Sequence, residues 1–203
     1  MSEVTYIPWK PPTETELPHI EALWNDVWDA RMRAIELKRI LSAPADQRRL
    51  QVEPLVIAAL TKYFRAFGSG RRRRKLRLED ASDLPGSLRT AHEHLKAVRD
   101  RHIAHPVNRY EAHHVTLAIA DLGTTRARAT SVSTNSTAFY GLSLDEVNRL
   151  IALSDYWLER LGEEKVSASA TLLELAQTLT PDELNALPSG YDDALDEDPF
   201  LFR

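Results

Sequence analysis

The chain of 203 residues contains no cysteine. This absence excludes disulfide bonds, zinc sites built on thiolates and cysteine nucleophiles. Glycine is also sparse, with seven residues in the whole chain, and no glycine-rich segment has the lysine spacing of a nucleotide-binding P-loop. The G-x-S-x-G sequence of a serine-hydrolase nucleophile elbow is missing as well. The common nucleotide-hydrolysing and acyl-transfer enzymes are therefore poor candidates.

Long apolar runs are missing too. None approaches the roughly 20 residues needed to cross a bilayer, and the first residues lack the basic and apolar regions of a signal peptide. A hydrophobic content of 43% and a charged content of 28% are typical of a globular protein with one buried core. We therefore expect a cytoplasmic protein that has no membrane partner.

The net charge of −4 is unevenly distributed. Residues 182–203 contain seven acidic residues and one basic residue, so the rest of the chain is weakly basic. Five consecutive cations form a basic run, which consists of Arg71, Arg72, Arg73, Arg74 and Lys75. Clustered arginines make bidentate contacts with phosphate, which favours RNA binding. Cations that complement the end of a preceding helix, or a solvated loop, would have the same composition.

Apolar side chains recur at helical spacing in most of the chain, which predicts a mainly α protein. The four long helices of the expected bundle lie near residues 16–41, 50–67, 84–103 and 143–162. The domain organisation predicted from these patterns is an extended arm (1–13), a helical domain (14–165), C-terminal helices (166–188) and an acidic tail (189–203). The C-terminal helices are expected at 167–179 and from Thr180 to about Pro188.

Several residues mark the expected helix ends. Thr13 and Ser143 are each followed three residues later by Glu, which is typical of a capping box. Gly68 is expected at the end of the second helix, because glycine adopts positive φ without a Cβ penalty, and Gly162 is expected to end the helix that begins after Ser143.

A β-hairpin is predicted at about 114–134, inserted between helices. Val115 to Ala120 and Ala129 to Thr134 are short, partly β-branched segments, and Gly123-Thr124-Thr125 supplies a turn between them.

Trp24 and Trp28 lie four residues apart on the apolar face of the first predicted helix. Such a pair could form a platform on which nucleic-acid bases stack. Aromatic residues at helical spacing on an apolar face are more often part of a core, so we expect both rings to be buried.

The chain is organised around Arg99-Asp100-Arg101-His102-Ile103-Ala104-His105-Pro106, at the end of the third predicted helix. Pro106 disfavours helical geometry at the residue before it. His105 is therefore expected at a helix terminus, held in position yet open to solvent. Most of the histidines lie within a few turns of this segment, namely His92, His94, His102, His105, His113 and His114.

Arg99 and His105 have the chemistry needed to cleave RNA without a metal ion. Such cleavage requires a base for the 2′-hydroxyl proton, a cation for the charged phosphorane and an acid for the leaving 5′-oxygen. Histidine serves as base or acid, and arginine holds two phosphate oxygens. Asp100 could orient or polarise a neighbour, Asn108 could donate to the substrate, and His102 could contact the RNA backbone together with the basic run.

An Arg and a His separated by five residues, with Asp after the Arg and a small residue before the His, resemble the R-x4–6-H signature of HEPN domains. The resemblance is strongest over residues 50–165, and it is closer to bacterial abortive-infection members than to the compact toxins. It implies an antiparallel helical bundle and a metal-independent endoribonuclease that uses no cofactor. RNA would be the substrate, and the product would carry a 2′,3′-cyclic phosphate.

The resemblance also implies partners and a setting. HEPN ribonucleases often double the Arg–His pair across a two-fold axis, so a homodimer is expected, and an antitoxin or regulatory protein is a further expected partner. The setting would be a toxin–antitoxin or abortive-infection system in phage defence or stress response. The predicted hairpin departs from the minimal four-helix HEPN bundle.

Three other interpretations compete with this one. Cations at the end of a helix are favoured by its unpaired carbonyl groups, which would explain the motif without any catalysis. Some HEPN-like proteins act as binding or scaffold modules for a protein or nucleotide partner. A metal site could be built from His102, His105, His113, His114, Glu111 and Asp121, but adjacent histidines on a strand point to opposite faces.

Overall fold

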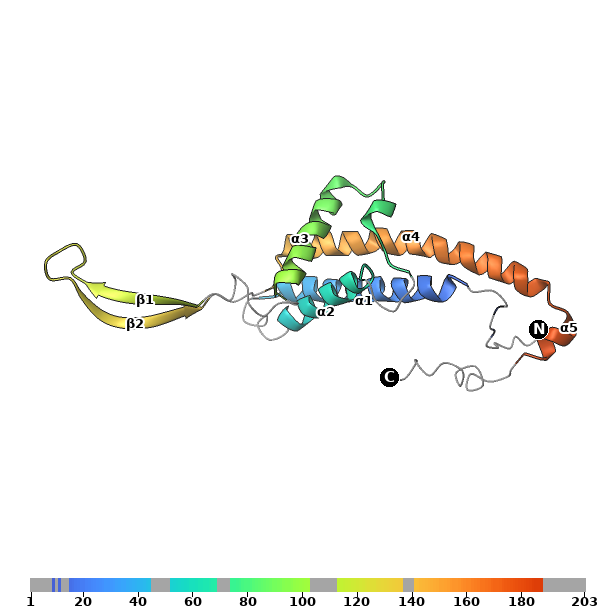
Figure 1. Ribbon diagram of the computed structural model, residues 1–203, viewed down its shortest axis with the longest axis horizontal. Helices are drawn as coiled ribbons and strands as arrows, with labels where there is room; N and C mark the ends of the chain where they lie inside the picture. The colour runs from blue at the N-terminus through green and yellow to red at the C-terminus, as the bar shows by residue number, and fades with distance from the viewer. Residues whose placement is uncertain are drawn as a thin grey trace.

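A computed structural model describes residues 9, 11, 15–44, 52–68, 74–102, 113–136 and 141–187. This part of the chain is mainly helical and has one small antiparallel sheet, as predicted (Figure 1). In chain order the elements are α1 (Leu17–Leu41), α2 (Val52–Arg65), a 3₁₀ turn (Leu78–Asp80), α3 (Gly86–His102), β1 (His113–Ala120), β2 (Arg128–Ser136), α4 (Leu144–Gln177) and α5 (Pro181–Asn185). Among these described helices, none combines the length and apolar character that a membrane span requires.

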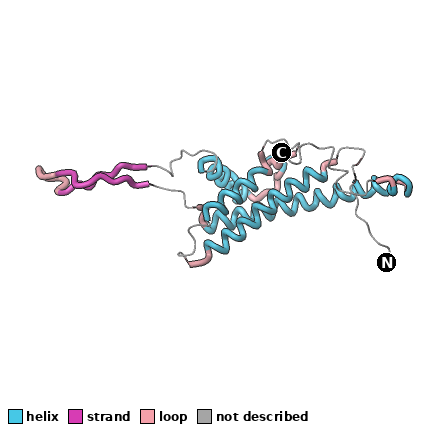
Figure 2. Tube along the Cα trace, turned by 90° about the horizontal axis from the view of Figure 1, so that it is seen from below, coloured by secondary structure: helices cyan, strands magenta, loops and turns pink. Residues whose placement is uncertain are grey.

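Helices α1 and α4 run antiparallel and form the frame of the molecule (Figures 1 and 2). Ion pairs fix their alignment, because Lys165 Nζ lies 2.6 Å from Glu21 Oε2 and Arg31 pairs with Asp155 further along the same interface. Between them lies a core of Leu, Val, Ala and aromatic side chains in which Trp157 and Tyr63 are the largest fully buried residues. This burial provides the main driving force for the fold.

Helix α2 packs on α1 and is held there by a buried carboxylate. Asp26 is 1% exposed, and both of its oxygens accept hydrogen bonds from Arg65, with Arg65 Nε at 2.8 Å from Oδ2. This hydrogen bond raises the pKa of Arg65. Lys62 Nζ lies 2.7 Å from Asp29 on the same interface. A buried carboxylate is tolerated because its charge is paired and hydrogen-bonded.

Helix α4 is longer than predicted. The sequence indicates one helix ending at Gly162 and another over 167–179, but α4 continues without a break from Leu144 to Gln177. A Cβ at Gly162 would meet no atom within 4 Å, so this half-buried helical position has room for a side chain. Strong helix formers on both sides outweigh its cost of about 1 kcal/mol. The predicted domain boundary after 165 therefore falls inside a continuous helix.

Some of the predicted helix ends are confirmed by the structure and others are wrong. Ser143 and Thr180 both form capping boxes with the Glu three residues later, which confirms the cap expected at Ser143. The cap of α1 is Glu16, whose side chain makes no capping hydrogen bond, so the box predicted from Thr13 is wrong. The positive φ expected at Gly68 is also absent, since the described glycines with positive φ are Gly123 and Gly141. Backbone hydrogen bonds from residue i+3 to residue i already satisfy the carbonyls at the end of α2.

The tryptophan prediction is correct for only one of the two rings. Trp24 packs against the core, but Trp28 is 41% exposed and stacks on Trp24 with 6.3 Å between ring centroids. Met32 and Ile35 are exposed on the same side of α1, four and seven residues after Trp28. The apolar face of α1 is therefore wider than the core that covers it. We call Trp28, Met32 and Ile35 the α1 stripe.

The predicted hairpin is confirmed. Strands β1 and β2 pair antiparallel with Leu117 opposite Val132, and Gly123 in the turn has a φ of 86°. The hairpin lies apart from the helices (Figures 1 and 2). Its large apolar side chains with described burial, namely Leu117, Ile119, Leu122 and Val132, are exposed to solvent, with Leu117 53% exposed. Backbone pairing, not burial against the bundle, holds its described strands together.

Candidate nucleic-acid interface

The structure describes part of the predicted site. Arg99 and Asp100 lie in the last turn of α3, Arg74 and Lys75 lie in the segment after α2, and His102 ends α3 without a described side chain. The other predicted site residues lie outside the described ranges, namely Arg71, Arg72, Arg73, His105 and Asn108.

Arg99 and Lys75 line one open cavity of about 570 Å³ between α2, α3 and the segment after the basic run. We call it the basic cavity. Arg77 and Lys96 line it as well, so four cations surround it, against two carboxylates from Glu79 and Glu93. The fold thus brings the end of the basic run beside the Arg99 motif, although about twenty residues separate them along the chain.

Backbone hydrogen bonds hold the wall of the basic cavity in place. The Leu76 amide donates to the Ala66 carbonyl at 2.8 Å, which ties the segment after the basic run to the end of α2. From α3, Arg89 donates to the carbonyls of Leu78 and Ala81 at 3.2 and 2.8 Å. Leu76 itself is buried. Lys75 and Arg77 therefore extend from an anchored backbone on either side of a buried leucine.

Arg99 contributes a guanidinium with hydrogen-bonding capacity left over. Its Cζ lies 5.2 Å from the centroid of the Phe64 ring, and a terminal nitrogen pairs with Asp100. The Nε atom is buried and has no hydrogen-bond partner in the structure. Because Nε is buried, a phosphate oxygen in the basic cavity could reach the guanidinium only at its terminal nitrogens, each of which has two N–H donors.

His92 forms part of the lining of the basic cavity and is 3% exposed. Its Nδ1 lies 3.1 Å from the Tyr63 hydroxyl oxygen, and its ring contacts Phe67 edge-on with 4.6 Å between centroids. Burial, reinforced by the charges of Lys96 and Arg89, lowers the pKa of His92 to about 4. The imidazole is consequently neutral at pH 7, so the cations of this wall are its lysine and arginine residues.

Arg74 does not line the basic cavity. Its guanidinium pairs with Glu164 on α4, and Nη1 lies 3.7 Å from Glu16 at the start of α1. These contacts give Arg74 a role in tying the basic run to the α1–α4 frame. Of the basic run's described residues, Lys75 is the one positioned to contact a ligand in the cavity.

Arg77, Lys96 and His92 also line the basic cavity but were not predicted from the sequence as site residues. His92, Lys96 and Arg99 follow one another at four- and three-residue spacing, which places them on one face of α3. That spacing is a signal that could have identified them. Arg77 carries no comparable signal, because only the turn after Leu76 directs it to the cavity.

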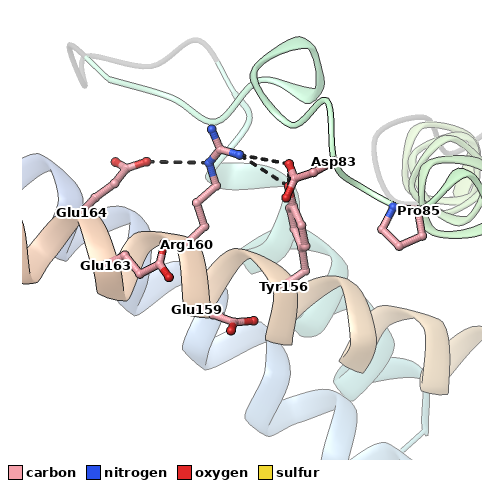
Figure 3. A pocket seen from close by; sticks show the side chains of 7 residues that line it. All are labelled: Asp83, Pro85, Tyr156, Glu159, Arg160, Glu163 and Glu164. Atoms are coloured by element: carbon pink, nitrogen blue, oxygen red, sulfur yellow. Dashed lines mark hydrogen bonds and ion pairs between the residues drawn. The ribbon is translucent and has the colours of Figure 1, made fainter.

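A second cavity, of about 590 Å³, lies between the segment before α3 and the middle of α4 (Figure 3). Tyr156 Oη donates to Asp83 Oδ1 at 2.7 Å, and Arg160 lies between Asp83 and Glu164. The hydrogen bond from Tyr156 lowers the pKa of Asp83. Glu159 and Glu163 add negative charge to the wall. The cavity would repel phosphate, and its central polar groups already bond one another.

The described residues contain no group of three or more His, Asp or Glu side chains placed to hold a metal ion. The proposed metal ligands His105 and Glu111 lie outside the described ranges. The chemistry that the described site offers is therefore that of cations and hydrogen-bond donors.

Comparisons with known proteins give no match. No protein-family model matches the sequence, and neither curated proteins nor solved structures match it. The function is therefore inferred from the residues of this chain.

Proposed function

We propose that the protein binds RNA at the basic cavity and cleaves it in a HEPN-like manner, without a metal ion, using Arg99 and His105. The observation that carries the proposal is the convergence of Lys75, Lys96 and Arg99 on one cavity beside the end of α3. Cations from separate chain segments that surround one cavity are suited to a polyanion.

In the proposed reaction Arg99 holds the scissile phosphate. Its terminal guanidinium nitrogens would donate to non-bridging oxygens and stabilise the negative charge of the phosphorane. Asp100, which pairs with Arg99, would fix the orientation of the guanidinium. His105 would take the proton of the 2′-hydroxyl or protonate the 5′-oxygen. The product of such attack is a 2′,3′-cyclic phosphate.

His92 is a poor substitute for His105 in this reaction. A pKa of about 4 leaves its imidazole neutral, and its Nδ1 is occupied by the Tyr63 hydroxyl. Such a ring is a weak general base, and at neutral pH it is not in the protonated form that a general acid requires. The proposal therefore assigns proton transfer to His105 and a supporting position in the wall to His92.

A homodimer is part of the proposal. The α1 stripe supports it, because exposed apolar side chains at helical spacing are typical of helix–helix interfaces. A dimer would provide a second Arg–His pair.

The experiment is incubation of purified protein with mixed tRNA and mRNA in EDTA, beside Arg99→Ala and His105→Ala variants. Arg101→Ala is the matched control, because Arg101 is exposed on α3 and does not line the cavity. The proposal predicts cyclic-phosphate ends from the parent and from Arg101→Ala, and loss of at least about 100-fold in rate in the other two. Binding without cleavage by the folded parent would instead favour a non-catalytic RNA-binding module.

A further inference from the structure

The basic cavity combines its cations with aromatic and apolar side chains. Phe64, Phe67, Leu76 and Leu78 line it together with the charged residues. Phe64 and His92 are buried, whereas Phe67 is half-buried and lines the cavity. Contacts with Tyr63, His92 and Trp157 hold the Phe67 ring in place. A ring fixed by its neighbours and partly open to a cavity is a suitable surface for stacking.

A duplex and a single strand would use such a cavity differently. A duplex presents phosphates on a convex backbone and keeps its bases stacked inside, so it could contact only the cations. An unpaired nucleotide presents a flat base next to its phosphate, and protein sites for it combine aromatic rings with basic side chains. The cavity volume of about 570 Å³ lies in the range of pockets that hold small ligands.

We propose that the basic cavity holds one unstacked nucleotide of single-stranded RNA, with its base against Phe67 and its phosphate on Lys96 and Arg99. This inference rests on the proposed function and specifies its substrate. Lys96 and Arg99 lie one turn apart on α3, while Phe67 extends from the end of α2. The base would therefore occupy the α2 side of the cavity and the phosphate the α3 side.

The test measures binding by fluorescence anisotropy with the full chain carrying His105→Ala, so that the RNA stays intact. Three ligands are compared, namely a single-stranded 12-mer, its blunt duplex, and a 12-mer that carries ribose phosphates without bases. The base-free oligomer separates stacking from charge, because both single strands present the same phosphates. We expect the normal single strand to bind at least roughly fivefold more tightly than the base-free one, since stacking on one aromatic side chain has at least this effect.

Three further variants assign the parts of the site. Phe67→Leu should weaken binding of the normal single strand roughly 5- to 100-fold and leave the base-free oligomer unaffected. Lys96→Gln should weaken all three ligands and reduce the salt dependence of binding, whereas Lys38→Gln, an exposed lysine on α1, should change none. Thermal unfolding checks that Phe67→Leu folds, and the comparison of ligands on the otherwise unchanged chain does not depend on that variant.

The inference would be overturned if the base-free strand or the duplex bound as tightly as the normal single strand. If the unsubstituted protein nevertheless cleaved RNA in EDTA, the proposed function would stand, and the RNA would be bound through its phosphates alone. Conversely, base-dependent binding without cleavage would retain the nucleotide site and remove the enzymatic role.

Discussion

Protonation of His92 should make the protein sensitive to mild acid. The imidazole is buried beside Tyr63 and Phe67, and burial lowers its pKa to about 4, with Lys96 and Arg89 adding to the effect. In the unfolded chain the same group has a pKa of about 6.5. Between these two values the unfolded state binds more protons than the folded state, so the free energy of unfolding falls as the pH is lowered from 6.5 towards 4.

The magnitude follows from the difference between the two pKa values. A pKa of about 4 in the folded protein against the ordinary 6.5, at about 1.4 kcal/mol for each pH unit, corresponds to roughly 3 kcal/mol. The loss begins near pH 6.5 and is nearly complete once the pH falls below the folded pKa. For a domain of this size that is a substantial part of a typical stability of about 5–15 kcal/mol.

Urea unfolding followed by circular dichroism at pH 7, 5.5 and 4.5 measures this effect, with His92→Gln as the test variant. The glutamine side chain does not titrate but can still form a hydrogen bond with the Tyr63 hydroxyl. Asp83 and Glu146 have lowered pKa values, and their stabilisation is also lost as the pH falls. This contribution is common to both proteins and cancels in the difference between their pH slopes. His19→Gln, in the first turn of α1, serves as the matched control.

We expect the parent and His19→Gln to lose roughly 2 kcal/mol more than His92→Gln between pH 7 and pH 4.5. His92→Gln should be less stable at pH 7 because it loses ring contacts, so only the pH slopes decide the question. Identical slopes for the parent and His92→Gln would refute the reasoning, since they would mean that His92 titrates alike in both states.

Three further substitutions have effects that the geometry specifies, and urea unfolding at pH 7 measures each. Gly141→Ala should destabilise by about 2 kcal/mol or more, because Gly141 has a φ of 120° and an added Cβ would lie 2.7 Å from Val52 Cγ1; an unchanged midpoint would contradict this close approach. Gly162→Ala should stabilise by about 0.5–1 kcal/mol, because its helical position is open, and a loss would indicate a hidden contact. Ser143→Ala should cost about 1 kcal/mol by removing the acceptor for the Glu146 amide, with an effect near zero arguing against the capping box.

The sequence was sufficient to predict the helical class, the hairpin and the boundaries of α1 and α3 to within a few residues. These features depend on local signals, namely apolar periodicity and β-branched segments, and the start of α4 was likewise predictable from the cap at Ser143. The break expected at Gly162 was wrong because one glycine outweighs neither its helix-forming neighbours nor the packing of α4 on α1. The exposure of Trp28 also depends on tertiary packing, since periodicity marks an apolar face without showing how much of it is covered.

The candidate site was predictable in part. Arg99 and Lys75 were identified from a motif and from a basic run, but their proximity arises from the way the segment after α2 turns back at Leu76. Nothing in local sequence specifies that turn. Phe67 was also outside the prediction, because an aromatic residue near a helix end has no signature that separates a binding surface from a core.

The most direct test of the central claim is the end chemistry of RNA treated with the protein in EDTA. We expect 2′,3′-cyclic phosphate ends from the parent and from Arg101→Ala, and their loss in Arg99→Ala and His105→Ala proteins that remain folded. Cleavage that requires a divalent metal, leaves other ends, or persists in both site variants would contradict it.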